Sequence, residues 1–187
     1  MPKRLVLVGA AVLIAVAATV WLVLPSGGGV GRELAGGGDA LETEGNGHRI
    51  GFRSAKTGEE IYFLSPAPVN LGDRDIVFKS AALATVPAGI EFVDARVYRR
   101  SEFDAVPINW SSSMGSPGSD PRRKRSSSIE GVELKAGQTM DDVVLVHVRV
   151  IGSQRPLEMS GIRYTYKYRD GDKEWQQVVP VDLSIKG

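Results

Sequence analysis

Two patterns of hydrophobic residues divide the chain. Residues 5–24 form one apolar run of twenty residues without a charge, whereas from residue 48 onward hydrophobic and polar residues alternate with a period of two. A period of two is typical of β-strands, because successive side chains of a strand point to opposite faces. The sequence therefore predicts one apolar helix followed by a β-rich domain.

The clearest strand patterns lie in the C-terminal part of the chain. Asp142–Ile151 places His147 and Arg149 on one face and valines on the other, at positions Val144, Val146, Val148 and Val150. Gly161–Arg169 and Glu174–Ile185 also alternate, and the turn residues Asp170-Gly171-Asp172 between them indicate a hairpin. These segments predict three long strands with one face buried.

Shorter alternating segments precede them. They are Ile61–Leu64, Ile76–Leu83, Ile90–Arg99 and Ala105–Trp110. Apart from residues 5–24, no stretch combines helical periodicity with capping residues. Seven or eight short strands with this spacing predict an all-β fold, namely an antiparallel β-sandwich.

The apolar run predicts a transmembrane signal-anchor helix. Twenty residues in an α-helix span about 30 Å, the thickness of the hydrocarbon layer of a bilayer. Lys3 and Arg4 lie on one side of the run, and Arg32 is the first charge on the other. The positive-inside rule then places residues 1–4 in the cytoplasm and the C-terminal domain outside.

Two alternatives to an anchor stay open at this point. Ala15-Val16-Ala17 fits the cleavage site of a signal peptide, and cleavage there would export the same domain. A buried core helix is the other alternative, although such a helix is seldom twenty residues long and terminal.

Residues 25–47 are rich in glycine and carry acidic residues without hydrophobic periodicity. Such a composition buries too little apolar area to offset the entropy lost on ordering, which predicts a flexible linker. The expected organisation is a cytoplasmic tip (1–4), a transmembrane helix (5–24), a linker (25–47) and an extracytoplasmic domain (48–187).

A family resemblance is carried by the C-terminal residues. The segment Leu134-Lys135-Ala136-Gly137-Gln138, followed by Val143–Val150 and a tyrosine-rich strand, resembles bacterial extracytoplasmic immunoglobulin-like domains. With its anchor and glycine-rich spacer, the whole chain resembles small membrane-tethered proteins of actinobacteria. The resemblance implies an immunoglobulin-like sandwich over about residues 130–187, and it carries over no active site.

Composition narrows the classes of function. The chain has 23 basic and 22 acidic residues, a net charge of +1, and it lacks the basic excess of nucleic-acid-binding domains. It contains no cysteine, which excludes disulfides, thiolate zinc sites and thiol catalysis. We therefore expect no nucleic-acid partner.

One short segment, Ser111–Ser128, has a local excess of positive charge. It contains eight serines and the run Arg122-Arg123-Lys124-Arg125. Its composition predicts a disordered loop inside the domain. Four adjacent cations could contact an anionic polymer or phospholipid headgroups, at about 1 kcal/mol per charge near an anionic surface. These four residues are the candidate anion-contact site, and a solvated insertion without a role is the alternative.

Aromatic residues offer a second candidate. Tyr164, Tyr166, Tyr168 and Trp175 could form a binding platform for sugars or peptides, but aromatic residues at period two more often face the core of a sheet.

Metal sites have weak support. Asp170, Asp172 and Glu174 alternate like calcium ligands, yet the segment lacks the glycine-bearing loop of such sites. His48 and His147 are the only histidines, too few for a transition-metal site without cysteine. We expect neither a metal nor a cofactor.

No G-x-S-x-G, H-E-x-x-H or phosphate-loop motif is present. The sequence therefore predicts a single-pass membrane protein that presents a non-catalytic binding or assembly module to the cell envelope. Its partner would be an envelope protein or an anionic polymer. The alternatives are an envelope hydrolase or transferase using dispersed carboxylates, and a structural subunit of a membrane complex.

Overall fold

The computed structural model describes residues 34–43, 48–113 and 117–187. The expected cytoplasmic tip and transmembrane helix lie outside these residues. No helix within the described ranges has the length and apolar character needed to span a membrane. The described residues form an all-β structure with three short 3-10 helices.

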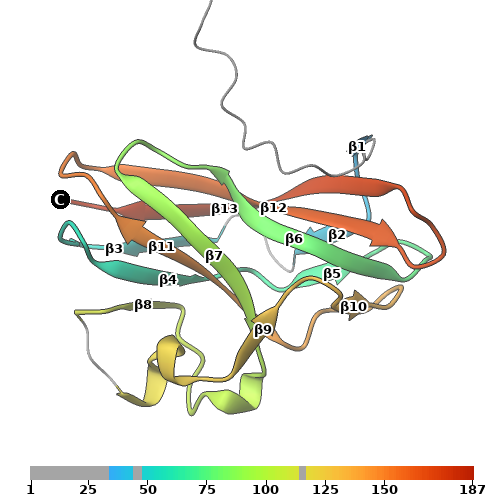
Figure 1. The fold of residues 1–187 in the computed structure, drawn as a ribbon, viewed down its shortest axis with the longest axis horizontal. Coiled ribbons are helices and arrows are strands. Elements are labelled where there is room, and N and C mark those ends of the chain that lie inside the picture. Colours follow the sequence, from blue (N-terminus) through green and yellow to red (C-terminus); the bar gives the residue numbers. More distant parts are fainter. Residues whose placement is uncertain (1–33, 44–47, 114–116) are drawn as a thin grey trace, which may run out of the picture. The chain divides into compact units, whose positions relative to one another are not determined.

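Two larger sheets make up most of the structure (Figure 1). The strands of the first sheet, in spatial order, are β1 (Leu34–Gly37), β13 (Glu174–Ile185), β12 (Leu157–Tyr168), β6 (Ile76–Thr85) and β10 (Glu133–Leu134), with β3 (Arg49–Phe52) also beside β13. The strands of the second are β8 (Asn109–Ser111), β4 (Glu60–Leu64), β11 (Val143–Val150), β7 (Ile90–Tyr98) and β9 (Ser126–Ser128). A small third sheet pairs β2 (Leu41–Thr43) with β5 (Pro68–Asn70).

One hydrophobic core contains side chains from both larger sheets, which is the arrangement of a β-sandwich. The predicted valine stripe of β11 is buried in it, with Val146 and Val148 fully inaccessible. Tyr164 and Tyr166 of β12 are also fully buried, so these predicted inward positions are confirmed. The prediction of an all-β chain is thereby confirmed in the described residues.

The opposite face of β11 is buried as well, which simple alternation did not predict. Val143 and Leu145 belong to a second, smaller cluster on the outer face of the second sheet. The other buried members of this cluster are Tyr62, Tyr98, Phe103 and Trp110. Phe103 lies in the connection between β7 and β8, and Trp110 lies on β8.

The prediction of a linker over residues 25–47 is wrong for Leu34–Thr43. Strand β1 pairs with β13 and β2 pairs with β5, while Ala40 and Leu41 are buried in the main core. The N–H of Leu41 donates to Gln177 Oε1 at 2.8 Å. Each of these strands is too short to produce a visible hydrophobic period, which is why the pattern missed them.

The structure requires glycine at position 38 of this segment. A Cβ atom on Gly38 would lie 2.1 Å from the hydroxyl oxygen of Tyr166, so no larger residue fits without displacing that tyrosine. The segment therefore approaches β12 closely.

The expectation of a purely antiparallel sandwich also needs correction. Strands β1 and β3 both run parallel to β13, while the other pairings are antiparallel in the described part. Both parallel strands belong to the N-terminal part of the sandwich and reach β13 from elsewhere in the chain, without a hairpin connection.

The segment expected to be a disordered loop, residues 111–128, has regular structure where it is described. It contains η2 (Pro117–Ser119), η3 (Pro121–Arg123) and strand β9, and a further 3-10 helix, η1 (Arg100–Glu102), precedes it. Asp120 caps η3, since its Oδ1 accepts from the Arg122 N–H at 3.0 Å, and Pro121 occupies the first helical position. The strand expected over Ala105–Trp110 is reduced to β8.

Candidate functional site

A row of aromatic and polar side chains crosses the outer face of the second sheet. Trp110 of β8 pairs with Tyr62 of β4, Tyr62 pairs with His147 of β11, and His147 pairs with Asp94 of β7. The Tyr62 and His147 rings are stacked with their centroids 4.1 Å apart, and the Trp110 ring meets Tyr62 edge-on at 5.7 Å. We call these four residues the cross-strand row.

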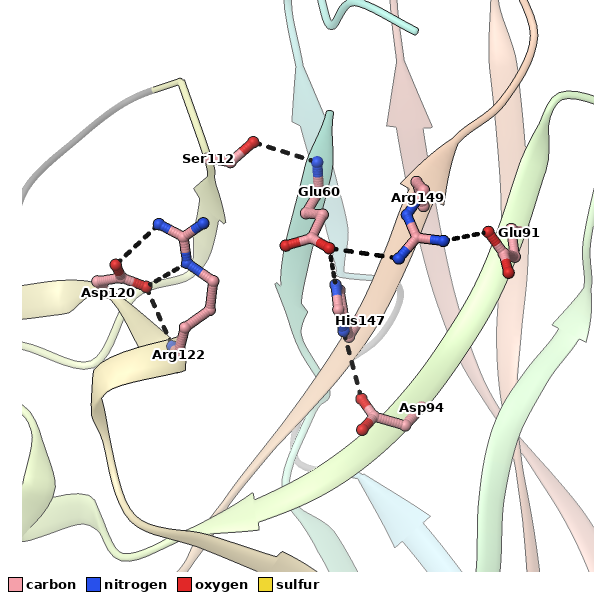
Figure 2. A network of polar contacts seen from close by, with 8 residues as sticks. All are labelled: Glu60, Glu91, Asp94, Ser112, Asp120, Arg122, His147 and Arg149. Carbon is pink, nitrogen blue, oxygen red and sulfur yellow. Dashed lines mark hydrogen bonds and ion pairs between the residues drawn. The ribbon is translucent and has the colours of Figure 1, made fainter. Parts of the chain in front are cut away.

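Charged residues of the same strands lie beside His147 and Asp94 (Figure 2). Arg149 pairs with Glu91 Oε2 at 2.9 Å and with Glu60 Oε1 at 3.4 Å. His147 lies between two carboxylates, with Nδ1 3.5 Å from Asp94 Oδ1 and Nε2 3.9 Å from Glu60 Oε1. The imidazole thus links β4 and β7 through its own strand, β11.

The electrostatics of His147 are dominated by burial. Burial lowers the pKa of His147 below its ordinary value, while Asp94 and Glu60 oppose that effect and Arg149 adds to it. The neutral imidazole is therefore the main form near neutral pH. Within the described residues, the buried side-chain atoms without a hydrogen-bond partner are Asp94 Oδ1, Trp110 Nε1 and His147 Nε2, all in the cross-strand row.

This geometry limits the chemistry that His147 can perform. A histidine oriented by a carboxylate can act as a general base when its second nitrogen reaches a hydroxyl or a substrate. Here the second nitrogen, Nε2, is buried and faces Glu60. In the described ranges no group of three or more histidine and acidic residues is arranged to hold a metal ion. The cross-strand row therefore connects four strands rather than presenting a reactive atom.

The basic run begins with a residue that the fold uses internally. The Arg122 guanidinium donates to both oxygens of Asp120, at 3.0 and 2.9 Å, and lies over the Trp110 ring, 4.7 Å from its centroid. Hydrogen bonds from Arg122 hold the pKa of Asp120 below its ordinary value. Arg122 thereby fastens the basic run to the cross-strand row.

Of the remaining three cations, Arg123 and Arg125 are exposed and Lys124 is half-buried. Arg123 Nε lies 3.6 Å from Asp120 Oδ2, but its side chain is 68% exposed. Lys124 Nζ lies 5.6 Å from the centroid of the Phe103 ring, and Arg125 is exposed. The structure thus divides the predicted four-residue site into one anchoring residue and three residues that can reach a partner.

Arg125 also lines a cavity of about 400 Å³ at the end of the second sheet where β7 ends and β11 begins. The other charged residues at its wall are Arg99, Glu102 and Asp142, and the hydroxyl side chains are Ser126 and Ser127. Sequence reasoning missed this site because its residues come from three separate segments. Only the run that includes Arg125 gave a local signal.

The remaining sequence candidates do not assemble into sites. Tyr164 and Tyr166 belong to the core, and the partly buried Tyr168 is covered by the Arg74 guanidinium at 3.5 Å from the ring centroid. Trp175 is partly buried against the same core. An exposed aromatic platform is therefore not formed by these residues.

Two of the three acidic residues of the predicted hairpin, Asp170 and Asp172, form ion pairs with basic residues. Asp170 lies 3.9 Å from Arg74, and Asp172 lies 3.7 Å from Lys167. The hairpin between β12 and β13 is present as predicted. His48 precedes β3 of the first sheet, whereas His147 lies on β11 of the second.

Comparisons with known proteins add a distant structural likeness. No protein-family model matches the chain, and no curated protein matches it. Among solved structures, the VesB protease of Vibrio cholerae is similar over 77% of this chain, with 12% sequence identity and a TM-score of 0.33. The match spans 32% of the VesB chain, about a third of its length.

Proposed function

We propose that this chain is a single-pass membrane protein whose exported β-sandwich is a non-catalytic binding module for an anionic partner in the cell envelope. The apolar run 5–24, with Lys3 and Arg4 on one side, supports the anchor and its orientation. The sandwich with its mostly antiparallel pairings supports an immunoglobulin-like domain, as does the resemblance over residues 130–187.

One observation supports the assignment of the basic run as the contact surface. The fold holds this run in place instead of leaving it extended into solvent. Asp120 caps η3 and pairs with Arg122, and Arg122 lies over Trp110. Arg123, Lys124 and Arg125 therefore project from a segment that has already lost conformational freedom. Such preorganised cations lose less entropy when they bind. We infer that these three residues form the anion contact and that Arg122 positions them.

This proposal predicts salt-dependent binding to an anionic polymer. The full chain in neutral maltoside micelles is mixed with fluorescent poly(glycerol phosphate), and binding is followed by fluorescence anisotropy. Replacing Arg123, Lys124 and Arg125 together by glutamine should weaken binding at least about a hundredfold, at about 1 kcal/mol per charge. Binding should also fade between low and physiological salt, where the screening length falls to about 8 Å.

The matched control removes three other exposed cations, by Arg53→Gln, Arg163→Gln and Lys186→Gln. This control has the same net charge as the test variant, so it should keep most of the binding. Equal losses in the two triple variants would show that only net charge matters, and undetectable binding of the unaltered chain at low salt would refute the proposed contact.

A further inference from the structure

We propose that the cavity beside Arg125 is a binding site for a zwitterionic group, which carries a phosphate or carboxylate and a primary ammonium a few bonds apart. Arg99 and Arg125 would hold the anionic part, and Glu102 and Asp142 the ammonium. This inference rests on the proposed function because Arg125 belongs to both surfaces. The ligand class differs from that of the proposed polymer contact, and Arg99, Glu102 and Asp142 belong to the cavity alone.

The charges of this cavity are not used by the fold. Within the described residues, no ion pair within 4.0 Å joins Arg99, Glu102, Arg125 or Asp142 to an opposite charge. By contrast, Arg149 on the same sheet forms ion pairs with two carboxylates, those of Glu60 and Glu91. Two guanidinium groups and two carboxylates around one cavity therefore keep their hydrogen-bonding capacity for a ligand.

The cavity wall is fixed by backbone and side-chain hydrogen bonds. In η1, the Glu102 N–H donates to Arg99 O at 2.9 Å. Arg96 of β7 holds β9, because its Nε donates to Ser126 Oγ at 2.7 Å and its Nη2 to Ser126 O at 3.3 Å. The segments that carry Arg99, Glu102 and Arg125 are thus held before a ligand arrives. The hydroxyl of Ser127 adds a donor for an anionic oxygen.

The mixture of charges selects the ligand class. A simple anion at Arg99 and Arg125 would be repelled by Glu102 and Asp142. A simple cation at the two carboxylates would be repelled by the two arginines. A ligand with both charges satisfies all four residues. The volume of about 400 Å³ lies in the range of small-molecule sites. Phosphoethanolamine has this chemistry, either as a free solute or as a lipid headgroup.

The test titrates the full chain in maltoside micelles with O-phosphoethanolamine and measures the heat of binding. We expect saturation below about 10 mM. Ethanolamine alone and inorganic phosphate alone should bind at least about tenfold more weakly, because each leaves one pair of charges unmatched. Phosphatidylethanolamine incorporated into the micelles distinguishes a lipid from a soluble source, since only a lipid-binding site lets it compete with the free headgroup.

Two variants localise the site. Arg99→Gln and Glu102→Gln should each weaken O-phosphoethanolamine binding about tenfold, while Arg163→Gln, on the exposed face of β12 and outside the cavity, should leave it unchanged. Unchanged melting midpoints confirm that the variants are folded. Equal affinity for phosphate and for O-phosphoethanolamine, or no saturation by O-phosphoethanolamine, overturns the zwitterion site. Binding of poly(glycerol phosphate) by the same sample then shows that the proposed function stands without it.

Discussion

Replacing Val146 by aspartate is expected to prevent the sandwich from folding. Val146 is fully buried in the main core and faces Phe63 of β4 and Ala95 of β7 in register. A buried, unpaired carboxylate costs several kcal/mol, and loss of the valine side chain removes about 1.5–3 kcal/mol of burial. Together these terms are comparable with the total stability of a typical domain, about 5–15 kcal/mol.

Circular dichroism of the full chain during heating measures this effect. Val146→Asp should show no cooperative transition, or a midpoint lowered by more than about 10 °C. Arg163→Ala is the matched control, because Arg163 lies on the exposed face of β12 in the same sandwich. If both variants melt at the same temperature, the assignment of the buried face of β11 is incorrect.

Removal of β1 and β2 is expected to have the second largest effect on stability. An exported fragment that begins at His48 lacks Ala40 and Leu41, which are buried in the core. Loss of the Leu41 side chain costs about 1.5–3 kcal/mol, and the Gln177 and Tyr166 side chains lose their contacts with this segment. We expect the fragment 48–187 to be about 3–5 kcal/mol less stable than the fragment 32–187.

Urea unfolding of the two fragments measures the difference directly. Leu41→Ala in the longer fragment is the control for packing, and it should reproduce about 2–3 kcal/mol of the loss. Equal unfolding midpoints of fragments 32–187 and 48–187 would mean that residues 34–43 do not contribute to the core.

The long strands could be predicted from the sequence because each repeats its hydrophobic period several times. The expected strand Glu174–Ile185 has the same bounds as β13, and the valine stripe is the buried face of β11. β1 and β2 contain four and three residues and do not complete such a pattern. Their place is set by tertiary contacts such as the one between Leu41 and Gln177.

The cross-strand row could not be predicted, because its four residues come from four strands. The register of β8, β4, β11 and β7 brings Trp110, Tyr62, His147 and Asp94 together, and a single strand pattern contains no information on that register. The cap of η3, unlike the row, has a signal in the local sequence. Asp120 followed by Pro121 is a local signal for a helical turn, and it indicates that part of the serine-rich segment is ordered.

The membrane topology tests the central proposal most directly, and the absence of native cysteine makes the measurement clean. Gly187→Cys and Pro2→Cys are introduced separately into the full chain and expressed in intact cells of the native host. A membrane-impermeant maleimide is then added before or after lysis. The proposal predicts labelling of Gly187→Cys before lysis and of Pro2→Cys only after lysis. Labelling of Pro2→Cys alone before lysis, or of neither variant until lysis, would contradict an exported, tethered domain.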